Sequence, residues 1–226
     1  MIKDIKLGIG MMRNSLTYEH SIFACLLALG VGIVFAFLLP VPALSGLYIA
    51  IGCMGYVQQI YFISVSTLVQ SSPYKKKFRT TIPAYITLFA MLIANTLCLV
   101  MHWLSYLRVR NNESIYLMSM EYDSKTYANT MVICALLMVG ILLYMVLANV
   151  LFFPATIVLV GMWIWWKFSI GTIDLAYWDI SIGMGILLSY VVVFAGAFIL
   201  YIVNCLTYKL EYSKLSYQGP LKRASK

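Results

Sequence analysis

Charged side chains are scarce in this 226-residue chain, in which only 11% of the residues are charged and 62% are hydrophobic. A soluble domain cannot hide that many apolar side chains, because much of its surface must be polar. The mean hydropathy of +0.89 therefore places the chain among integral membrane proteins. No segment outside the apolar runs is long enough to bury a core of its own.

The apolar runs contain no aspartate, glutamate or arginine. Ion-coupled transporters usually need a buried carboxylate or broken helices that coordinate the ion, and intramembrane hydrolases need converging catalytic groups. Of the two histidines, His20 precedes the first run and His102 is alone in a later one. The phosphate-binding pattern Gly-x-x-x-x-Gly-Lys-Ser/Thr is also missing. We therefore expect no catalytic residue, cofactor site or metal site in this chain, which disfavours an enzyme or a secondary transporter.

The cysteines give no sign of a disulfide or a metal site. All five lie inside apolar runs, and no Cys-x-x-Cys pair occurs. We interpret them as small buried hydrophobic side chains. The beginning of the chain shows no pattern of a cleavable signal peptide.

Six apolar runs are candidates for membrane spans, because about 20 helical residues cover the ~30 Å hydrocarbon core of a bilayer. The expected spans are residues 21–39, 44–68, 82–106, 130–152, 154–168 and 180–206. The fifth is the shortest, and the polar residues 107–127 are expected to form a larger loop after the third. We predict an all-α integral membrane fold with six transmembrane helices in a single domain, residues 1–226.

The residues before the first span, 1–18, are expected to form an amphipathic helix in the plane of the interface. Apolar side chains recur there at helical spacing, at Ile2, Ile5, Ile9, Met12 and Leu16. The glycines Gly8 and Gly10 weaken this prediction, because glycine disfavours the helix.

Small residues recur at every fourth position of the first span, where they would let another helix approach closely. This helix-packing stripe consists of Ala24, Ala28, Gly32 and Ala36. The same recurrence also fits the ordinary composition of a span, so the sequence leaves both interpretations open.

Five amide side chains lie within the spans, where an unsatisfied amide is costly. They are Gln58, Gln59, Asn95, Asn149 and Asn204. Each either lines a polar cavity or forms a hydrogen bond between helices, which contributes about 0.6 kcal/mol on average. Gln58 and Gln59 point about 100° apart on a helix, so at least one is expected to face protein or a cavity.

Lysine and arginine are distributed unevenly between the two sides of this six-span arrangement. The N-terminal segment, the loop after the second span and the tail 207–226 hold twelve of them, and the other side holds four. Cytoplasmic loops accumulate Lys and Arg, so we expect a multi-pass plasma-membrane protein with both termini in the cytoplasm. The formal net charge of +8 is then explained by topology, without nucleic acid as a partner.

The loop at residues 70–83 is the one long polar interruption in the first half of the chain. It places four positive charges within five residues, between Pro73 and Pro83. One interpretation is a solvated basic loop that orients the protein and contacts lipid headgroups. The other is a short helix that docks into a cytoplasmic protein.

Such a helix has a candidate start and a candidate docking face. Ser71 or Ser72 can cap it, with Pro73 in its first turn, where the missing N–H costs little. Tyr74 and Phe78 are four residues apart and are expected to share one face.

The run Ser71-Ser72-Pro73-Tyr74-Lys75-Lys76-Lys77, which continues to Thr80-Thr81-Ile82-Pro83, resembles a segment of the permease subunits of type-II (ABC-2) ATP-binding cassette exporters. In that family, and especially in small six-span permeases of Gram-positive bacteria, the segment joins spans two and three. The interfacial helix, the six spans and the cytoplasmic termini fit as well. The connection between spans five and six is shorter than in larger members, which leaves little room for a re-entrant gate.

The resemblance implies that two permeases, as a homodimer or a heterodimer, assemble with two separate cytoplasmic ATPases that bind ATP and Mg²⁺. Residues 1–18 are then the elbow helix, and residues 70–81 are the coupling helix that a groove of the ATPase receives. The residues implied in this coupling are Ser71, Ser72, Pro73, Tyr74, Lys75, Lys76, Lys77, Phe78 and Arg79.

We therefore expect the permease subunit of an ATP-driven exporter. Its cargo would be hydrophobic or amphipathic, such as a peptide, because no buried charge selects a small ion. Exporters of phenol-soluble modulins are similar in these features. The alternative is a membrane scaffold or assembly protein without transport, whose basic loop binds lipid or a partner.

Overall fold

The computed structural model is helical and contains no strand in the part of the chain that it describes. This part consists of residues 2–14, 18–37, 42–65, 67–111, 124–150, 161 and 178–210. The all-α prediction is thus confirmed for these residues.

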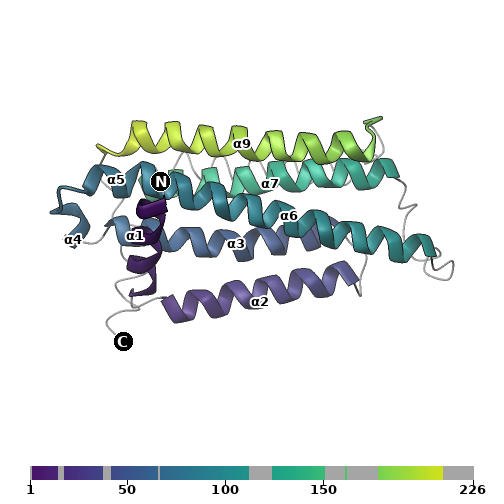
Figure 1. Ribbon diagram of the computed structural model, residues 1–226, viewed down its shortest axis with the longest axis horizontal. Helices are drawn as coiled ribbons and strands as arrows, with labels where there is room; N and C mark the ends of the chain where they lie inside the picture. Colours follow the sequence, from purple (N-terminus) through teal and green to yellow (C-terminus); the bar gives the residue numbers. More distant parts are fainter. Residues whose placement is uncertain are drawn as a thin grey trace.

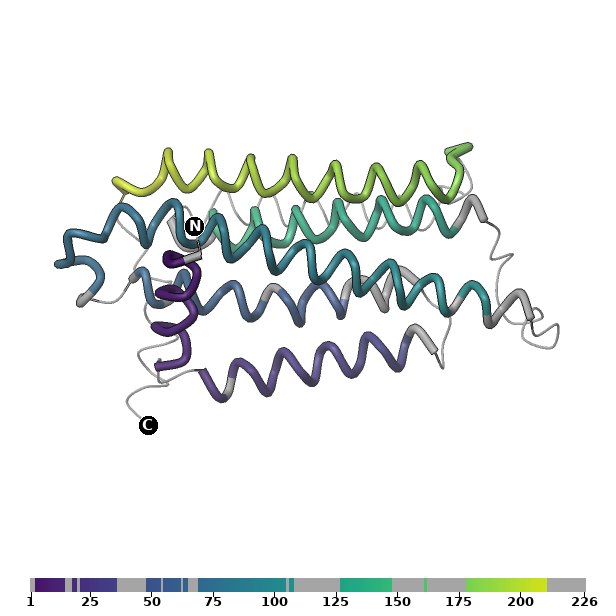
Figure 2. Tube along the Cα trace, viewed as in Figure 1, coloured from purple at the N-terminus to yellow at the C-terminus, as the bar shows by residue number. Residues whose placement is uncertain are grey.

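Long helices lie side by side along one axis (Figure 1). They are α2 (Tyr18–Phe37), α3 (Pro42–Val65), α6 (Thr81–Asn111), α7 (Ser124–Val150) and α9 (Ile182–Thr207). The shorter helices are α1 (Ile2–Arg13), α4 (Thr67–Gln70) and α5 (Lys75–Arg79). Figure 2 shows α1 running across the bundle axis, near the end that carries α5.

Four of the long helices form a bundle, in which α3 packs on α6 and α7, and α9 packs on the same two helices. Helix α2 lies on the outside of this bundle, against α3. The buried core contains side chains such as Ile60, Met91, Met138 and Leu200, one from each bundle helix. Met12 of α1 and Phe78 of α5 belong to the same core, so both short elements are packed onto the bundle.

Helices occupy five of the six segments in which spans were expected, and the expected span 154–168 lies outside the described residues. Within the described part, three segments are long and apolar enough to cross a membrane. They are Lys75–Leu104, Tyr127–Leu147 and Ile182–Thr207. The first includes α5, whose lysines make its N-terminal end polar.

The loop expected at residues 107–127 is shorter than predicted. Helix α6 continues to Asn111, and α7 already begins at Ser124. Polar residues in the last turns of a long helix do not end it, because exposed polar side chains are compatible with helical geometry. The prediction placed both boundaries where hydrophobicity falls, and the helices extend beyond that limit.

The break between α5 and α6 follows from Pro83. Proline has no N–H, so the carbonyl of Arg79 loses the donor that a continuous helix would give it. Helix α5 ends at Arg79, and α6 begins at Thr81. Thr80 bridges them, since both its backbone N–H and its Oγ1 donate to the Lys76 carbonyl, at 3.0 and 2.8 Å.

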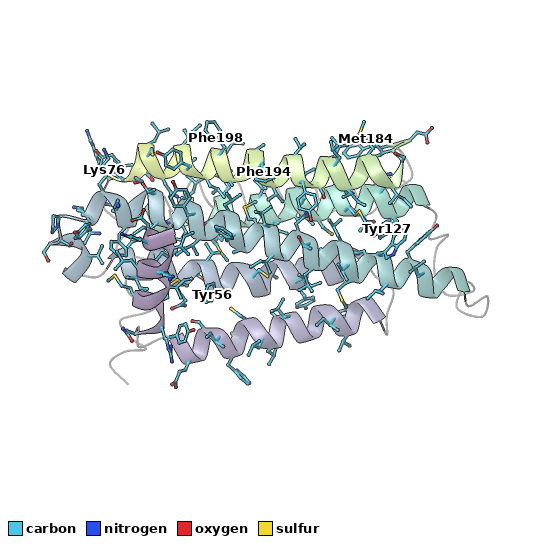
Figure 3. The ribbon with its side chains drawn as sticks, viewed as in Figure 1. Tyr56, Lys76, Tyr127, Met184, Phe194 and Phe198 are labelled. Atoms are coloured by element: carbon cyan, nitrogen blue, oxygen red, sulfur yellow. The ribbon has the colours of Figure 1, made fainter. Side chains whose placement is uncertain are left out.

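The bundle has two chemically different ends, which we call the basic end and the aromatic end. The basic end carries α1, α5 and the C-terminal end of α9. The aromatic end carries Trp103, Tyr106 and Tyr127, whose ring centroids lie 5.5–5.9 Å apart. Figure 3 shows Lys76 and Tyr127 toward opposite ends of the molecule. Aromatic clusters of this kind are typical of membrane–water interfaces.

Candidate functional site

The turn before α5 is organised by Ser72. Its backbone carbonyl accepts a hydrogen bond from the Lys75 N–H at 3.0 Å, and its Oγ accepts one from the Tyr74 N–H at 3.1 Å. The N-cap position itself is Tyr74, which makes no side-chain cap. The predicted cap at Ser71 or Ser72 was therefore placed too early, because Pro73 and Tyr74 belong to the turn and not to the helix.

Tyr74 and Phe78 do not form one docking face. The side chain of Tyr74 is 56% exposed, whereas that of Phe78 is 3% exposed and lies in the core. Four-residue spacing aligns two side chains only when both residues are helical, and Tyr74 precedes the helix. The exposed surface of this segment instead includes Tyr74, Lys75 and Lys76, together with Ser71, Pro73 and Lys77.

The loop is linked to the N-terminal helix by an ion pair. Lys77 Nζ donates a hydrogen bond to Asp4 Oδ1 at 2.8 Å. Behind this pair, α1 lies close against α6, because a Cβ on Gly8 would come within 2.7 Å of Ile86 and 2.8 Å of Ile82. The glycine that weakened the helix prediction is thus the residue that lets α1 approach α6.

The loop is also linked to the end of α9. Arg79 is 6% exposed, and its Nη2 donates to the Leu210 carbonyl at 2.8 Å. A cation is favourable there, because the C-terminus of a helix carries partial negative charge. The Nζ of Lys76 lies 5.8 Å from the centre of the Tyr208 ring. The loop therefore contacts α1, the bundle core and α9 at once.

Asp4, Tyr208 and Leu210 carried no signal in the sequence that connected them with the loop. They lie 73, 132 and 131 positions from their partners Lys77, Lys76 and Arg79. A spacing pattern describes only one element, whereas these contacts depend on how distant elements pack against each other.

Three of the five amide residues form hydrogen bonds between helices. Gln59 donates to Ser21 of α2. Asn95 donates to Ser189 of α9 at 3.2 Å, and Asn204 donates to the Tyr61 hydroxyl of α3 at 3.0 Å. Of the other two, Gln58 is half-buried, and the side chain of Asn149 lies outside what the structure describes.

The expected packing stripe on α2 has a mixed environment. Gly32 is buried, Ala28 is half-buried and Ala24 is exposed. The side chain of Ala36 is not among those described.

Two glycines of α3 lie where α2 approaches closely. A Cβ on Gly52 would lie 2.7 Å from Leu29 Cγ and 2.9 Å from the Cys25 carbonyl oxygen. A Cβ on Gly55 would lie 2.8 Å from Cys25 Sγ. Gly52 and Gly55 of α3 therefore let the two helices approach closely, and the predicted stripe on α2 stays a prediction.

Among the described residues, no three His, Cys, Asp or Glu side chains converge on a metal-sized site. Comparison with known proteins adds no relative, since no protein-family model, curated protein or solved structure matches the chain. The candidate site therefore rests on the geometry of the loop at 70–83 and on its chemistry.

The Asp4–Lys77 pair gives a pH-dependent expectation. The hydrogen bond from Lys77 lowers the pKa of the Asp4 carboxyl below its ordinary value of 3.8. A lowered pKa means that the contribution of the pair is fully present above pH 3.8 and is lost as the pH falls through the folded-state value. In an NMR titration of the full chain in micelles, Asp4 should titrate below 3.8, and Lys77→Gln should return its pKa toward that value.

The matched control for this titration is Lys6→Gln, which removes a charge from the exposed side of α1. If Lys6→Gln moved the pKa of Asp4 as far as Lys77→Gln does, the 2.8 Å contact would not be the cause of the shift.

Proposed function

We propose that this chain is the permease subunit of an ATP-driven exporter, with six membrane spans and both termini in the cytoplasm. Three observations support the membrane placement: the long apolar helices, the basic end and the aromatic end. The basic end faces the cytoplasm, as expected from the distribution of lysine and arginine. Helix α1 then lies across the bundle at the level of the interface.

The observation that carries the proposal is the two-sided character of the loop at 70–83. One side includes the exposed residues Tyr74, Lys75 and Lys76, and Figure 3 shows Lys76 at the basic end. The other side is held by Phe78 in the core and by Arg79 at the end of α9. A protein that pushes on the exposed side would move α6 and α9 together. A loop whose positive charges only orient the protein in the membrane would not need these contacts with the core and with α9.

The motor is a separate cytoplasmic ATPase, because the chain has no nucleotide-binding pattern of its own. ATP binding closes a pair of these subunits against a pair of permeases. Tyr74 and Lys75 receive the ATPase surface, and Phe78 transmits its movement to the bundle. In this role Tyr74 is the contact residue and Phe78 is a positioning residue.

A hydrophobic or amphipathic peptide is the cargo class that fits best. The spans expected from the sequence hold no carboxylate or guanidinium to select a small ion. Gln59, Asn95 and Asn204 are engaged in bonds between helices, so they already have partners in this conformation. The cargo would therefore be selected by its shape and by apolar contact with the spans.

The test is co-purification of the tagged chain from its native membrane. We expect a protein with a nucleotide-binding motif to be recovered with the wild type and to show ATP hydrolysis in the complex. With the variant Tyr74→Ala/Lys75→Ala, the amount of ATPase recovered should fall at least tenfold, while expression of the chain is unchanged.

The matched control is Lys3→Ala/Lys6→Ala, which alters two exposed residues of α1 at the same end of the bundle. This control should keep the ATPase. Recovery of the wild type with lipid or assembly factors, and never with an ATPase, would favour the scaffold alternative and reject the exporter.

A further inference from the structure

A second feature of the basic end lies at the junction of α5 and α9. The ammonium groups of Lys76 and Lys209 lie 5.8 and 5.9 Å from the centre of the same Tyr208 ring. We call these three residues the Tyr208 cluster. Each lysine gains a cation–π contact there, so two positive charges are held beside one ring.

The described surroundings do not neutralise the Tyr208 cluster. The carboxylate of Asp4 is engaged by Lys77, and within the described residues neither Lys76 nor Lys209 forms an ion pair with a carboxylate. The charge of this junction therefore fits an anion.

An apolar stripe on α9 leads up to the cluster. Phe198, Ile202 and Leu206 are each four residues apart, so they share one face of the helix. Phe198 is 63% exposed and Leu206 is 73% exposed. Three residues after Leu206, the chain reaches Lys209. A ligand that fits both features has a negative head and a long apolar chain.

We propose that the Tyr208 cluster binds the headgroup of an anionic phospholipid, with an acyl chain along Phe198, Ile202 and Leu206. Lys76 and Lys209 contact the phosphate, and Tyr208 lies at the level of the headgroups, as interfacial tyrosines do. The bound lipid joins α5 to the end of α9 through the two lysines. This inference rests on the membrane placement in the proposed function, and it needs neither an ATPase nor transport.

The experiment measures lipid binding to the purified full chain in a neutral detergent. Phosphatidylglycerol is titrated while the thermal midpoint is followed, with phosphatidylcholine as the neutral lipid. We expect phosphatidylglycerol to raise the midpoint and phosphatidylcholine to leave it nearly unchanged. The variant Lys76→Gln/Lys209→Gln should bind phosphatidylglycerol about thirtyfold more weakly, because each lysine near an anionic surface contributes about fivefold.

The matched control is Lys3→Gln/Lys6→Gln, which removes the same charge from α1. Equal weakening in both variants would show a general effect of net charge and overturn the proposal, as would equal stabilisation by the two lipids. Inorganic phosphate and glycerophosphoglycerol provide the free anion and the free headgroup. If either stabilised the chain as well as the lipid does, the site would be one for a soluble anion.

A second variant tests the acyl contact without touching a charge. Leu206→Gln changes the most exposed residue of the stripe, so its folding should be intact by circular dichroism. It should weaken binding of phosphatidylglycerol several-fold and leave the weak response to glycerophosphoglycerol unchanged. Unaltered lipid affinity in this variant would reject the apolar half of the proposed site. Loss of ATPase recovery in the earlier experiment has no bearing on these measurements, so the two proposals fail separately.

Discussion

Replacing Phe78 by alanine is expected to lower the free energy of unfolding by about 3 kcal/mol, because it removes a buried aromatic side chain and leaves a cavity. Phe78 is 3% exposed and contributes to the main core. The measurement is reversible unfolding of the full chain in mixed micelles, followed by circular dichroism. Transport should also fall, even where the ATPase still binds, because the loop loses its contact with the bundle.

The matched control is Tyr74→Ala, which truncates an aromatic side chain of the same loop that is 56% exposed. We expect this change to alter the free energy of unfolding by less than about 0.5 kcal/mol. Its effect should appear in ATPase recovery instead. Similar destabilisation by the two substitutions would contradict the assignment of Phe78 to the core and Tyr74 to the surface.

Replacing Gly185 by alanine is expected to separate α7 from α9. The added Cβ would lie 2.9 Å from the Cα, the Cβ and the carbonyl oxygen of Ala128. Two of these atoms belong to the backbone, which cannot rotate away as a flexible side chain can. Overpacking of this kind costs about 1–3 kcal/mol. The same unfolding assay should show this loss, and cysteine cross-linking between α7 and α9 should become less efficient.

Gly183→Ala is the control for that substitution. Gly183 lies two residues earlier on the same helix, and a Cβ there would meet nothing within 4 Å. Because alanine favours the helix over glycine by up to about 1 kcal/mol, this variant should be as stable as the wild type or more so. A stability loss at Gly183 equal to that at Gly185 would mean that helix propensity, and not the approach of α7, governs both positions.

Much of the helical layout could be predicted without coordinates. Apolar runs located α2, α3 and α9 within about three residues at each end, because a helix with an apolar surface all round must be covered by lipid or protein. The break before α6 is equally local, since Pro83 has no N–H to offer Arg79. The amphipathic spacing of residues 2–16 predicted α1 for the same kind of reason. The end of α6 was predicted less well, because hydrophobicity falls before helical geometry ends.

The candidate site could be located from the sequence, but which of its residues are exposed could not be predicted. Four positive charges between two prolines marked the loop at 70–83. Whether Tyr74 or Phe78 is exposed depends on how a one-turn helix lies on the bundle, and residue spacing contains no information on that orientation. Lys76 and Tyr208 of the Tyr208 cluster lie more than 130 positions apart in the sequence.

Sequence by itself determined the apolar helices, the proline break and the concentration of positive charge at one end, because each depends on neighbouring residues along a single element. Tertiary structure alone decided which polar groups meet. Asn95 reaches Ser189 and Asn204 reaches Tyr61 across 94 and 143 positions. It also decided that Gly52 and Gly55 of α3 lie against Leu29 and Cys25 of α2. The physical reason is that contacts between helices depend on their rotation and their axial offset, and both are set only when all the apolar faces pack at once.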